Sequence, residues 1–372
     1  MADQYTEVTK KGFGSRLGNS FVGILIGIVL IIGSIYVLFT NEGRVDISKI
    51  ASSAAEISSE KLSTDGVLEN KLVSSTGVLS SDQLLGDDLF LKPGRNIVLQ
   101  RKVEMYSWVE NTSSKSKKEL GGSETTETTY TYSKKWTDSP KAAGEFRHPE
   151  GHENPERAHE NADFKVATAK VGIYELDPSM ASFPALSPLQ LNEQKVNLSG
   201  DLKVASKKYL FSGKGTISAP QVGDLRISYI SLPEGSKVTI FGKLAENSIM
   251  PYLDKDNNRI YRLFLGDRGM AIDELKGEYK TTIWLMRLIG FLMMWIGLGM
   301  IFEPLSVLLD ILPMLGSVSR FMVGVITFLV SLAVSIVIII VSMIVHNLLI
   351  LLIVLAITAA VVVWQLTQRK KK

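Results

Sequence analysis

The sequence contains no cysteine among its 372 residues. That absence excludes a disulfide framework, a cysteine nucleophile and every zinc or iron–sulfur site that needs a thiolate ligand. A charge excess of one sign is also missing, because 41 basic and 38 acidic side chains leave a formal net charge of only +3. Nucleic-acid binding usually depends on a strong positive field, so no nucleic-acid partner is expected.

Charge is nearly absent from long apolar runs near the two ends of the chain. A helix needs about 20 such residues to cross the hydrocarbon layer of a membrane. The first run could also be a cleaved signal peptide, because Lys10, Lys11 and Arg16 precede it, but its length and the lack of a small-residue cleavage site favour a retained anchor. Membrane spans are predicted at residues 21–40, 283–302, 321–345 and 348–366.

Lysine and arginine flank the first span on its N-terminal side and follow the last span. Because such residues are enriched on the cytoplasmic side, both termini are predicted to be cytoplasmic. The predicted organisation is a cytoplasmic N-terminal segment 1–20, an extracytoplasmic domain 41–282, a cytoplasmic re-entrant or interfacial segment 303–320 and a basic cytoplasmic tail 367–372.

Few charged residues interrupt the apolar runs. Arg287 lies close enough to the end of a span for its side chain to reach the interface. The segment 303–320 contains Pro304 and Pro313, which predicts a short helix at the membrane surface. With so few buried charges, an ion or solute path is the weaker hypothesis.

The segment 41–282 is predicted to be a mainly β domain of the α+β class. Apolar residues recur at helical spacing from 45 to 62, which predicts an amphipathic helix. Val103 and Met105 alternate with polar residues, as in a half-buried strand. Asn154-Pro155 is typical of a helix start. Strands are predicted at 71–79, 96–110, 126–136, 224–230, 237–244 and 258–265, with a mobile hairpin tip at 111–127, and a barrel-like or OB-like fold is among those that fit.

Five short motifs carry a resemblance to a known family. Together they resemble the LUMA family (transmembrane protein 43), and the loop containing Asp310 and Pro313 is similar too. The resemblance covers nearly the whole chain and implies an N-terminal span, a long extramembrane domain and C-terminal spans. In chain order the motifs are Asn41-Glu42-Gly43-Arg44, Val103-Glu104-Met105-Tyr106-Ser107-Trp108, Tyr130-x-Tyr132 with Trp136, Gly151-His152-Glu153-Asn154-Pro155 and Val222-Gly223-Asp224-Leu225-Arg226-Ile227-Ser228.

The family resemblance also implies a location and partners. Eukaryotic members reside in the endoplasmic reticulum and inner nuclear membrane, associate with emerin and lamins, and are thought to organise membrane protein complexes. A prokaryotic source would remove emerin and lamins and imply the bacterial inner membrane, with the architecture unchanged. The resemblance implies neither a catalytic mechanism nor a cofactor.

No pattern in the sequence supports catalysis. Gly12–Gly18 has the wrong spacing for a dinucleotide-binding turn. Asp254–Asn258 begins like a calcium loop, but Arg259 stands where glycine is needed, so a hairpin turn is favoured. The histidines and glutamates of 148–160 match no common zinc spacing, and a solvated loop is favoured over a metal site. Within it, His152 is expected to bond to the backbone and fix the loop.

Tyr106, Trp108, Tyr130, Tyr132 and Trp136 are predicted to share one face of a hairpin. Two explanations stay open: the rings close a core, or they form a binding surface for lipid, glycan or peptide. Glutamates on this face need partners if it is buried. The expected pairs join Glu104 and Glu110 to Arg101 and Lys134.

The exit from the first span suggests a junction with the aromatic hairpin. Gly43 would provide the backbone freedom that ends the helix, and Arg44 would pair with Glu104 or Glu110, or else contact lipid phosphate. Within the span, Gly23 and Gly27 share one helix face and allow close approach of another helix. That helix belongs either to a second copy, giving a homo-oligomer, or to the same chain.

The sequence therefore predicts a non-enzymatic membrane scaffold that organises membrane proteins or lipids. The alternative is an extracytoplasmic ligand-sensing receptor or a transport-associated membrane subunit.

Overall fold

The computed structural model describes residues 3–61, 66–311, 313–347, 351–353 and 355–361. The chain forms two compact units, each assembled from segments that are distant in sequence. The first contains residues 1–5, 47–113 and 129–276, and the second contains residues 6–46, 114–128 and 277–372.

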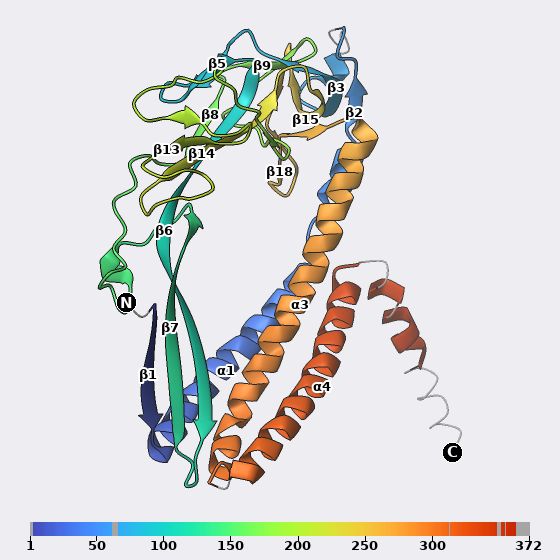
Figure 1. Ribbon diagram of the computed structural model, residues 1–372. Helices are drawn as coiled ribbons and strands as arrows, with labels where there is room; N and C mark the ends of the chain where they lie inside the picture. Colours follow the sequence, from blue (N-terminus) through green and yellow to red (C-terminus); the bar gives the residue numbers. More distant parts are fainter. Residues whose placement is uncertain (1–2, 62–65, 312, 348–350, 354, 362–372) are drawn as a thin grey trace. The chain divides into compact units, whose positions relative to one another are not determined.

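A closed barrel lies in the first unit (Figure 1). Every neighbouring pair in its ring is antiparallel except β10 and β16, and β15 returns to pair with β3. Closure leaves these strands without a free edge. The predicted barrel-like fold is therefore present, and its five strands are a feature shared with OB-folds. In ring order the strands are β3 (Leu72–Ser80), β9 (Ala169–Val171), β10 (Tyr174–Leu176), β16 (Ser248–Met250) and β15 (Lys237–Ala245).

Strand β15 is buried on both faces, because its alternating side chains enter two different cores. Val238 and Ile240 point into the barrel core, whereas Phe241 packs on the other side with α2 (Ile47–Ser52) and the first turns of α3 (Arg268–Leu309). Successive side chains of a strand point to opposite faces, so a strand covered on both sides is apolar at nearly every position.

A second sheet has the strand order β1-β7-β6-β14-β13-β12, with β8 and β11 attached to β6 and β14. Val103 and Met105 of β6 are buried in its core, and Val103 is paired with Ile227 of β14. The predicted alternation is thus present. The strands are β1 (Gln4–Lys11), β6 (Asn96–Lys118), β7 (Glu124–Thr137), β8 (Ala162–Lys165), β11 (Ser187–Pro188), β12 (Lys203–Val204), β13 (Leu210–Ser212) and β14 (Leu225–Pro233).

Two predicted helices of the first unit are wrong. Within the described part of the segment 45–62, which is 45–61, the only helix is the short α2, because β2 (Ala55–Ile57) leaves the helical path and pairs in parallel with β3. Tertiary pairing outweighs local propensity there. No helix follows Asn154-Pro155. The remaining elements are η1 (Gly66–Leu68), β4 (Leu85–Asp87), β5 (Leu91–Gly94), η2 (Ala143–Glu145), β17 (Tyr252–Leu253), β18 (Arg259–Ile260) and β19 (Arg262–Leu265).

The second unit contains α1 (Phe13–Glu42), most of α3 and α4 (Pro313–Val345). The described residues hold three helices long and apolar enough to cross a membrane, at Phe13–Ser52, Arg268–Leu309 and Arg320–Val345. The predicted span at 348–366 lies partly outside the described residues, which show a shorter apolar helix at Leu351–Val361.

The predicted surface helix at 303–320 is not a separate element. Instead, α3 continues through Pro304 to Leu309, and α4 begins at Pro313. Proline is accepted in the first turn of a helix, where its missing N–H has no partner in any case, and membrane helices also tolerate it internally.

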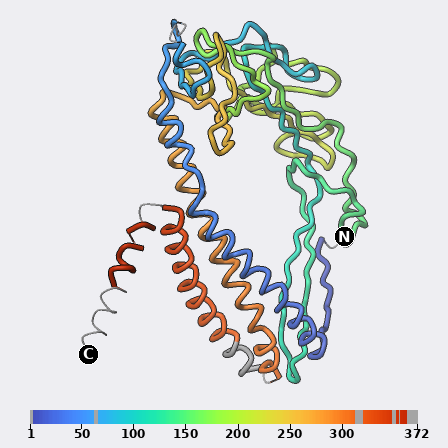
Figure 2. The backbone as a smooth tube through the Cα atoms, turned by 180° about the vertical axis from the view of Figure 1, so that it is seen from behind, coloured from blue at the N-terminus to red at the C-terminus, as the bar shows by residue number. Residues whose placement is uncertain are grey.

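Glycines let α1 and α3 approach closely, and Figure 2 shows the two helices side by side. A Cβ placed on Gly27 would lie 2.6 Å from the carbonyl oxygen of Gly297, and one on Gly297 would lie 2.8 Å from that of Gly27. The hydroxyl of Ser34 donates to the Gly290 carbonyl at 2.7 Å. Gly23 is less crowded, with Glu303 Oε2 at 3.5 Å from its ideal Cβ. The Gly23/Gly27 face thus meets a helix of the same chain.

Candidate functional site

Asp310, just beyond the end of α3, lies at the centre of a charge cluster in the second unit. Its side chain is 0% exposed. Oδ2 accepts hydrogen bonds from Arg16 Nη2 at 2.5 Å, Arg320 Nη1 at 2.8 Å and Lys118 Nζ at 2.9 Å. Oδ1 is buried and has no hydrogen-bond partner among the described residues. One carboxylate oxygen therefore contacts three cations, which come from α1, α4 and β6.

The tip of the β6–β7 hairpin is attached at the same place. Arg16 donates through Nη1 to the Gly122 carbonyl at 2.5 Å and lies 3.1 Å from Glu124 Oε2. The backbone N–H of Gly121 donates to the Ile311 carbonyl at 3.2 Å. Three cations face two carboxylates, so one positive charge is left over.

These contacts correct two expectations about residues 111–127. Strands β6 and β7 extend through most of the segment, and hydroxyl pairs such as Ser116–Thr126, at 2.7 Å, join them. The sequence also placed the whole of 41–282 across the membrane from Arg16 and Asp310. The tip touches both residues, which does not fit that placement.

A second ion pair joins α1 to α3. Glu42 accepts two hydrogen bonds from Arg287, at 2.8 and 2.7 Å, and its side chain is 5% exposed. That Arg287 reaches the interface stays a prediction, and the structure adds its partner, Glu42 at the end of α1. Beside the pair, Asn41 Nδ2 donates to the Ile283 carbonyl at 3.1 Å. Paired geometry of this kind is what makes a charge tolerable near a membrane.

The predicted junction through Gly43 and Arg44 is also corrected. Gly43 has φ −88°, which any residue adopts, so backbone freedom is not the reason for a glycine at this position. The reason is its small size, because a Cβ at this position would collide with the ring of His346. The backbone N–H of Arg44 donates to the Asn41 carbonyl at 3.1 Å. Glu104 is bound by Arg226, with 2.7 Å between Oε2 and Nε.

The expected partners of the hairpin glutamates are wrong as well. Arg101 pairs with the buried Asp87 at 2.6 Å, which also accepts the hydroxyl of Tyr229. Lys134 lies over the ring of Trp108, 4.3 Å from its centroid. Glu110 accepts the Tyr132 hydroxyl at 2.5 Å. Sequence spacing could not choose among these partners, since they come from other strands and loops.

His152 lies at the centre of the aromatic cluster. Its side chain is 1% exposed, stacked on Tyr132 with ring centroids 3.9 Å apart and edge-on to Trp108 at 4.7 Å. Nδ1 lies 3.1 Å from the His148 carbonyl, the backbone contact expected of it. Tyr5 stacks on His148, so the N-terminal strand also joins the cluster. Burial raises the pKa of Tyr132 to about 12, and the hydrogen bond to Glu110 is the second largest cause.

The aromatic rings are divided between two environments. Tyr132 is buried, whereas Tyr106, Trp136 and Tyr130 are partly exposed. Tyr106 and Trp136 meet edge-to-face at 5.4 Å, and the guanidinium of Arg226 lies 4.8 Å from the Trp136 ring. The rings thus close a local core around His152 and leave a half-exposed margin.

Asn154, predicted as a helix cap, serves as a strand partner. Its side chain accepts the N–H of Trp108 at 2.8 Å and donates to the Trp108 carbonyl at 3.0 Å. A Cβ on Gly223, where φ is +97°, would lie 2.9 Å from Pro155. The buried Asp224 accepts three backbone N–H groups, from Lys214, Gly215 and Gln221, at 2.7–3.1 Å. These motif residues hold loops against β6 and β14.

Among the described residues, no group of three or more metal-binding side chains is gathered in one place. Asp254 accepts the backbone N–H of Asp256 at 2.8 Å and of Asn258 at 2.7 Å, which forms a turn between β17 and β18. The side-chain hydrogen bond from Asn258 lowers the pKa of Asp254. His159 packs edge-on to Phe90. His159 therefore serves packing, and Asp254 serves turn formation.

Comparison with known proteins gives consistent matches. The profile of the transmembrane protein 43 family matches residues 105–348. Transmembrane protein 43 of Mus musculus is 28% identical over 333 residues, which cover 83% of this chain and 80% of that protein. The Homo sapiens protein is 28% identical, with 82% and 80% covered, and the Drosophila melanogaster homolog is 25% identical, with 73% and 74% covered. No solved structure matches the chain.

Proposed function

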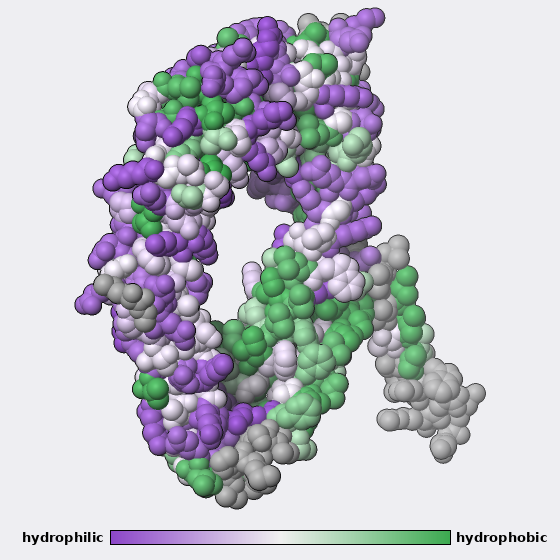
Figure 3. All heavy atoms as spheres, viewed as in Figure 1, coloured by the Kyte–Doolittle hydropathy of each residue, from purple (hydrophilic) through white to green (hydrophobic). Residues whose placement is uncertain are grey.

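Because the chain belongs to the transmembrane protein 43 family, we propose that it is a non-enzymatic scaffold that organises proteins and lipids of its membrane. One observation carries the proposal. In each of the three apolar helices, only 17% of the most apolar window is buried within the chain. Figure 3 shows apolar residues over the exposed surface of the helices, and surface of this kind is available to lipids and partner helices.

An exposed stripe on α1 is the best-defined face for a partner helix. Leu25, Val29, Ile32 and Tyr36 are 62–68% exposed and recur at helical spacing. The opposite face of α1 holds Gly27 against α3, so the stripe is free for a second protein. Emerin and lamins are proposed partners only for a eukaryotic source.

Affinity isolation of the full chain in mild detergent tests the scaffold. We expect membrane proteins in stoichiometric amounts, and Val29→Trp should reduce their recovery several-fold. Val8→Trp is the matched control, because Val8 is 66% exposed but lies on β1. A small molecule retained without any stoichiometric protein would instead support a sensing receptor or transport-associated subunit.

We further propose that both termini are cytoplasmic and that the hairpin tip shares their side. Lys10, Lys11 and Arg16 precede the apolar part of α1, and Lys118 and Arg320 meet at the same helix ends. Their common charge agrees with a cytoplasmic location.

Cysteine labelling tests this orientation without background, because the chain has no cysteine of its own. Leu120 lies at the tip and is 81% exposed. In sealed vesicles, the cysteine of the Leu120→Cys variant should not react with an impermeant thiol reagent added outside. Val45→Cys, just beyond the other end of α1 and 37% exposed, should react from outside. Reaction of Leu120→Cys from outside would place the tip on the other side and refute this part of the proposal.

A further inference from the structure

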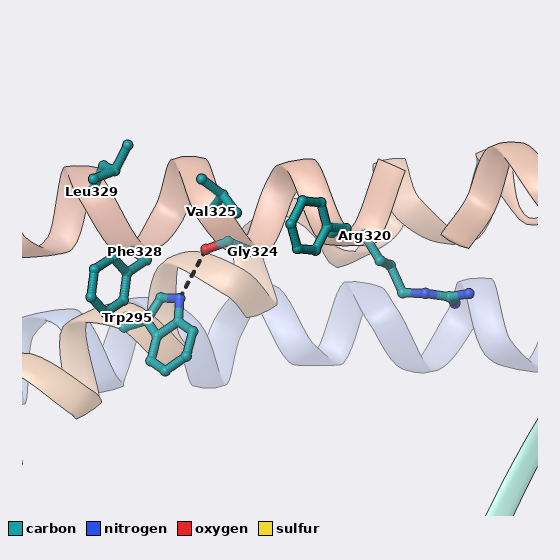
Figure 4. A pocket seen from close by; sticks show the side chains of 7 residues that line it. Trp295, Arg320, Gly324, Val325, Phe328 and Leu329 are labelled. Carbon is teal, nitrogen blue, oxygen red and sulfur yellow. Dashed lines mark hydrogen bonds between the residues drawn. The ribbon is translucent and has the colours of Figure 1, made fainter. Parts of the chain in front are cut away.

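A groove of about 520 Å³ lies between α3 and α4. Trp295 of α3 forms one wall, and Phe321, Val325, Phe328 and Leu329 of α4 are among the other lining residues (Figure 4). The Trp295 indole N–H is already occupied, because it donates to the Gly324 carbonyl at 3.2 Å. The surface offered to a ligand is therefore apolar along almost its whole length.

Open space lies above Gly324. A Cβ built on this residue meets no atom within 4 Å. From residue 320 to residue 329 the groove follows about 13 Å of helix, at ~1.5 Å rise per residue. Half the hydrocarbon thickness of a bilayer is about 15 Å. The groove thus has the length of an acyl chain within one leaflet.

Among the described residues that line the groove, Arg320 alone is charged, and it stands at one end. Figure 4 shows Arg320 and Leu329 at opposite ends of the row of side chains. Arg320 is the most exposed cation of the Asp310 cluster, at 35% against 22% for Lys118 and 6% for Arg16. The cluster carries one more cation than carboxylates, so its surplus positive charge is most accessible at Arg320.

We propose that this groove binds a phospholipid with an anionic headgroup, with one acyl chain along Trp295 and the phosphate at Arg320. Burial of the acyl chain against aromatic and aliphatic side chains supplies apolar contact, and guanidinium–phosphate hydrogen bonds hold the phosphate. The surplus positive charge at Arg320 supplies the headgroup preference, because an anionic lipid lacks the choline cation that compensates the phosphate charge of phosphatidylcholine. The inference deepens the lipid part of the proposed function and rests on it. Lipid retention and partner recovery are separate measurements, so either can fail alone.

A second groove between the same helices provides an internal contrast. It has a volume of about 390 Å³ and is lined by Trp284, Leu288 and Ile336 among others. Its arginine, Arg287, is neutralised by the two hydrogen bonds to Glu42. Lipid at that groove should therefore show no preference for an anionic headgroup.

The experiment uses the full chain in detergent, exposed to equal amounts of dioleoyl phosphatidylglycerol and dioleoyl phosphatidylcholine. Lipid retained after purification is extracted and counted by mass spectrometry. We expect the anionic lipid to be retained about tenfold over the zwitterionic one, near one molecule per chain. Equal retention of the two lipids would overturn the headgroup assignment.

Matched variants locate the bound lipid. Gly324→Leu fills the open space and should remove the anionic lipid, whereas Gly299→Leu makes the same change on α3 at a position that also has open space and does not line the groove. Arg320→Gln should abolish the preference, and Arg320→Lys should keep most of it. Retention by Gly324→Leu equal to that of the unaltered chain would refute the groove.

Trp295 gives a second readout that does not depend on purification. Brominated phosphatidylglycerol should quench its fluorescence at low mole fraction, measured as the difference from a Trp295→Phe variant. Brominated phosphatidylcholine should require about tenfold more lipid. If Arg320→Gln disturbs the fold through Asp310, the Gly324→Leu and Gly299→Leu pair still decides the question, because neither residue belongs to the charge cluster.

Discussion

Replacing Asp310 by asparagine is the most direct test of the charge cluster. The side chain keeps its size, but the negative charge shared by Arg16, Lys118 and Arg320 is lost. Removing one partner from a buried ion pair costs about 3 to 5 kcal/mol, because the other charge stays buried without compensation. Arg16, only 6% exposed, bears most of that cost, and Glu124 at 3.1 Å offsets part of it. We therefore expect a loss near the lower limit, about 3 kcal/mol.

Unfolding of the purified chain in mild detergent, followed by circular dichroism during heating and denaturant titration, measures the loss. Arg95→Gln is the control, since Arg95 is 77% exposed in its pair with Glu234 and should cost under about 1 kcal/mol. Asp310→Asn combined with Arg16→Gln should lose much less than the sum of the two single losses. Additive losses, or an Asp310→Asn loss no greater than that of Arg95→Gln, would refute the reasoning.

Three further outcomes follow from the packing. Gly27→Ala should destabilise the helices by about 1 to 3 kcal/mol through overpacking, whereas Gly18→Ala, with open space around it, should be neutral or slightly stabilising in the same thermal assay. Arg287→Gln should cost about 3 kcal/mol or more, and adding Glu42→Gln should recover part of it. Because the folded pKa of Tyr132 is raised to about 12, its stabilising effect is complete below about pH 10 and is lost as the pH rises toward 12. The ultraviolet titration of tyrosinate in the unaltered chain, minus that of Tyr132→Phe, should show one group that ionises near pH 12.

Local patterns were sufficient to predict the main strands and the apolar helices. Alternation at Val103 and Met105 marks β6, and the charge-free run before Asn41 marks α1. Each pattern depends on the side chains of a single helix or strand and on the surroundings of that element alone. The same reasoning failed at 45–62, where parallel pairing of β2 with β3, the next strand along the chain, replaced the expected helix.

The sequence by itself determined that this is a membrane chain of the transmembrane protein 43 family, with apolar helices and a mainly β region. Only the tertiary structure decided which charges meet. Arg16 and Asp310 are separated by 294 positions and Glu42 and Arg287 by 245, so no local period relates them. Closure of the barrel likewise depends on β15 returning to β3, a long-range contact whose loop-closure entropy has to be offset by packing elsewhere in the fold.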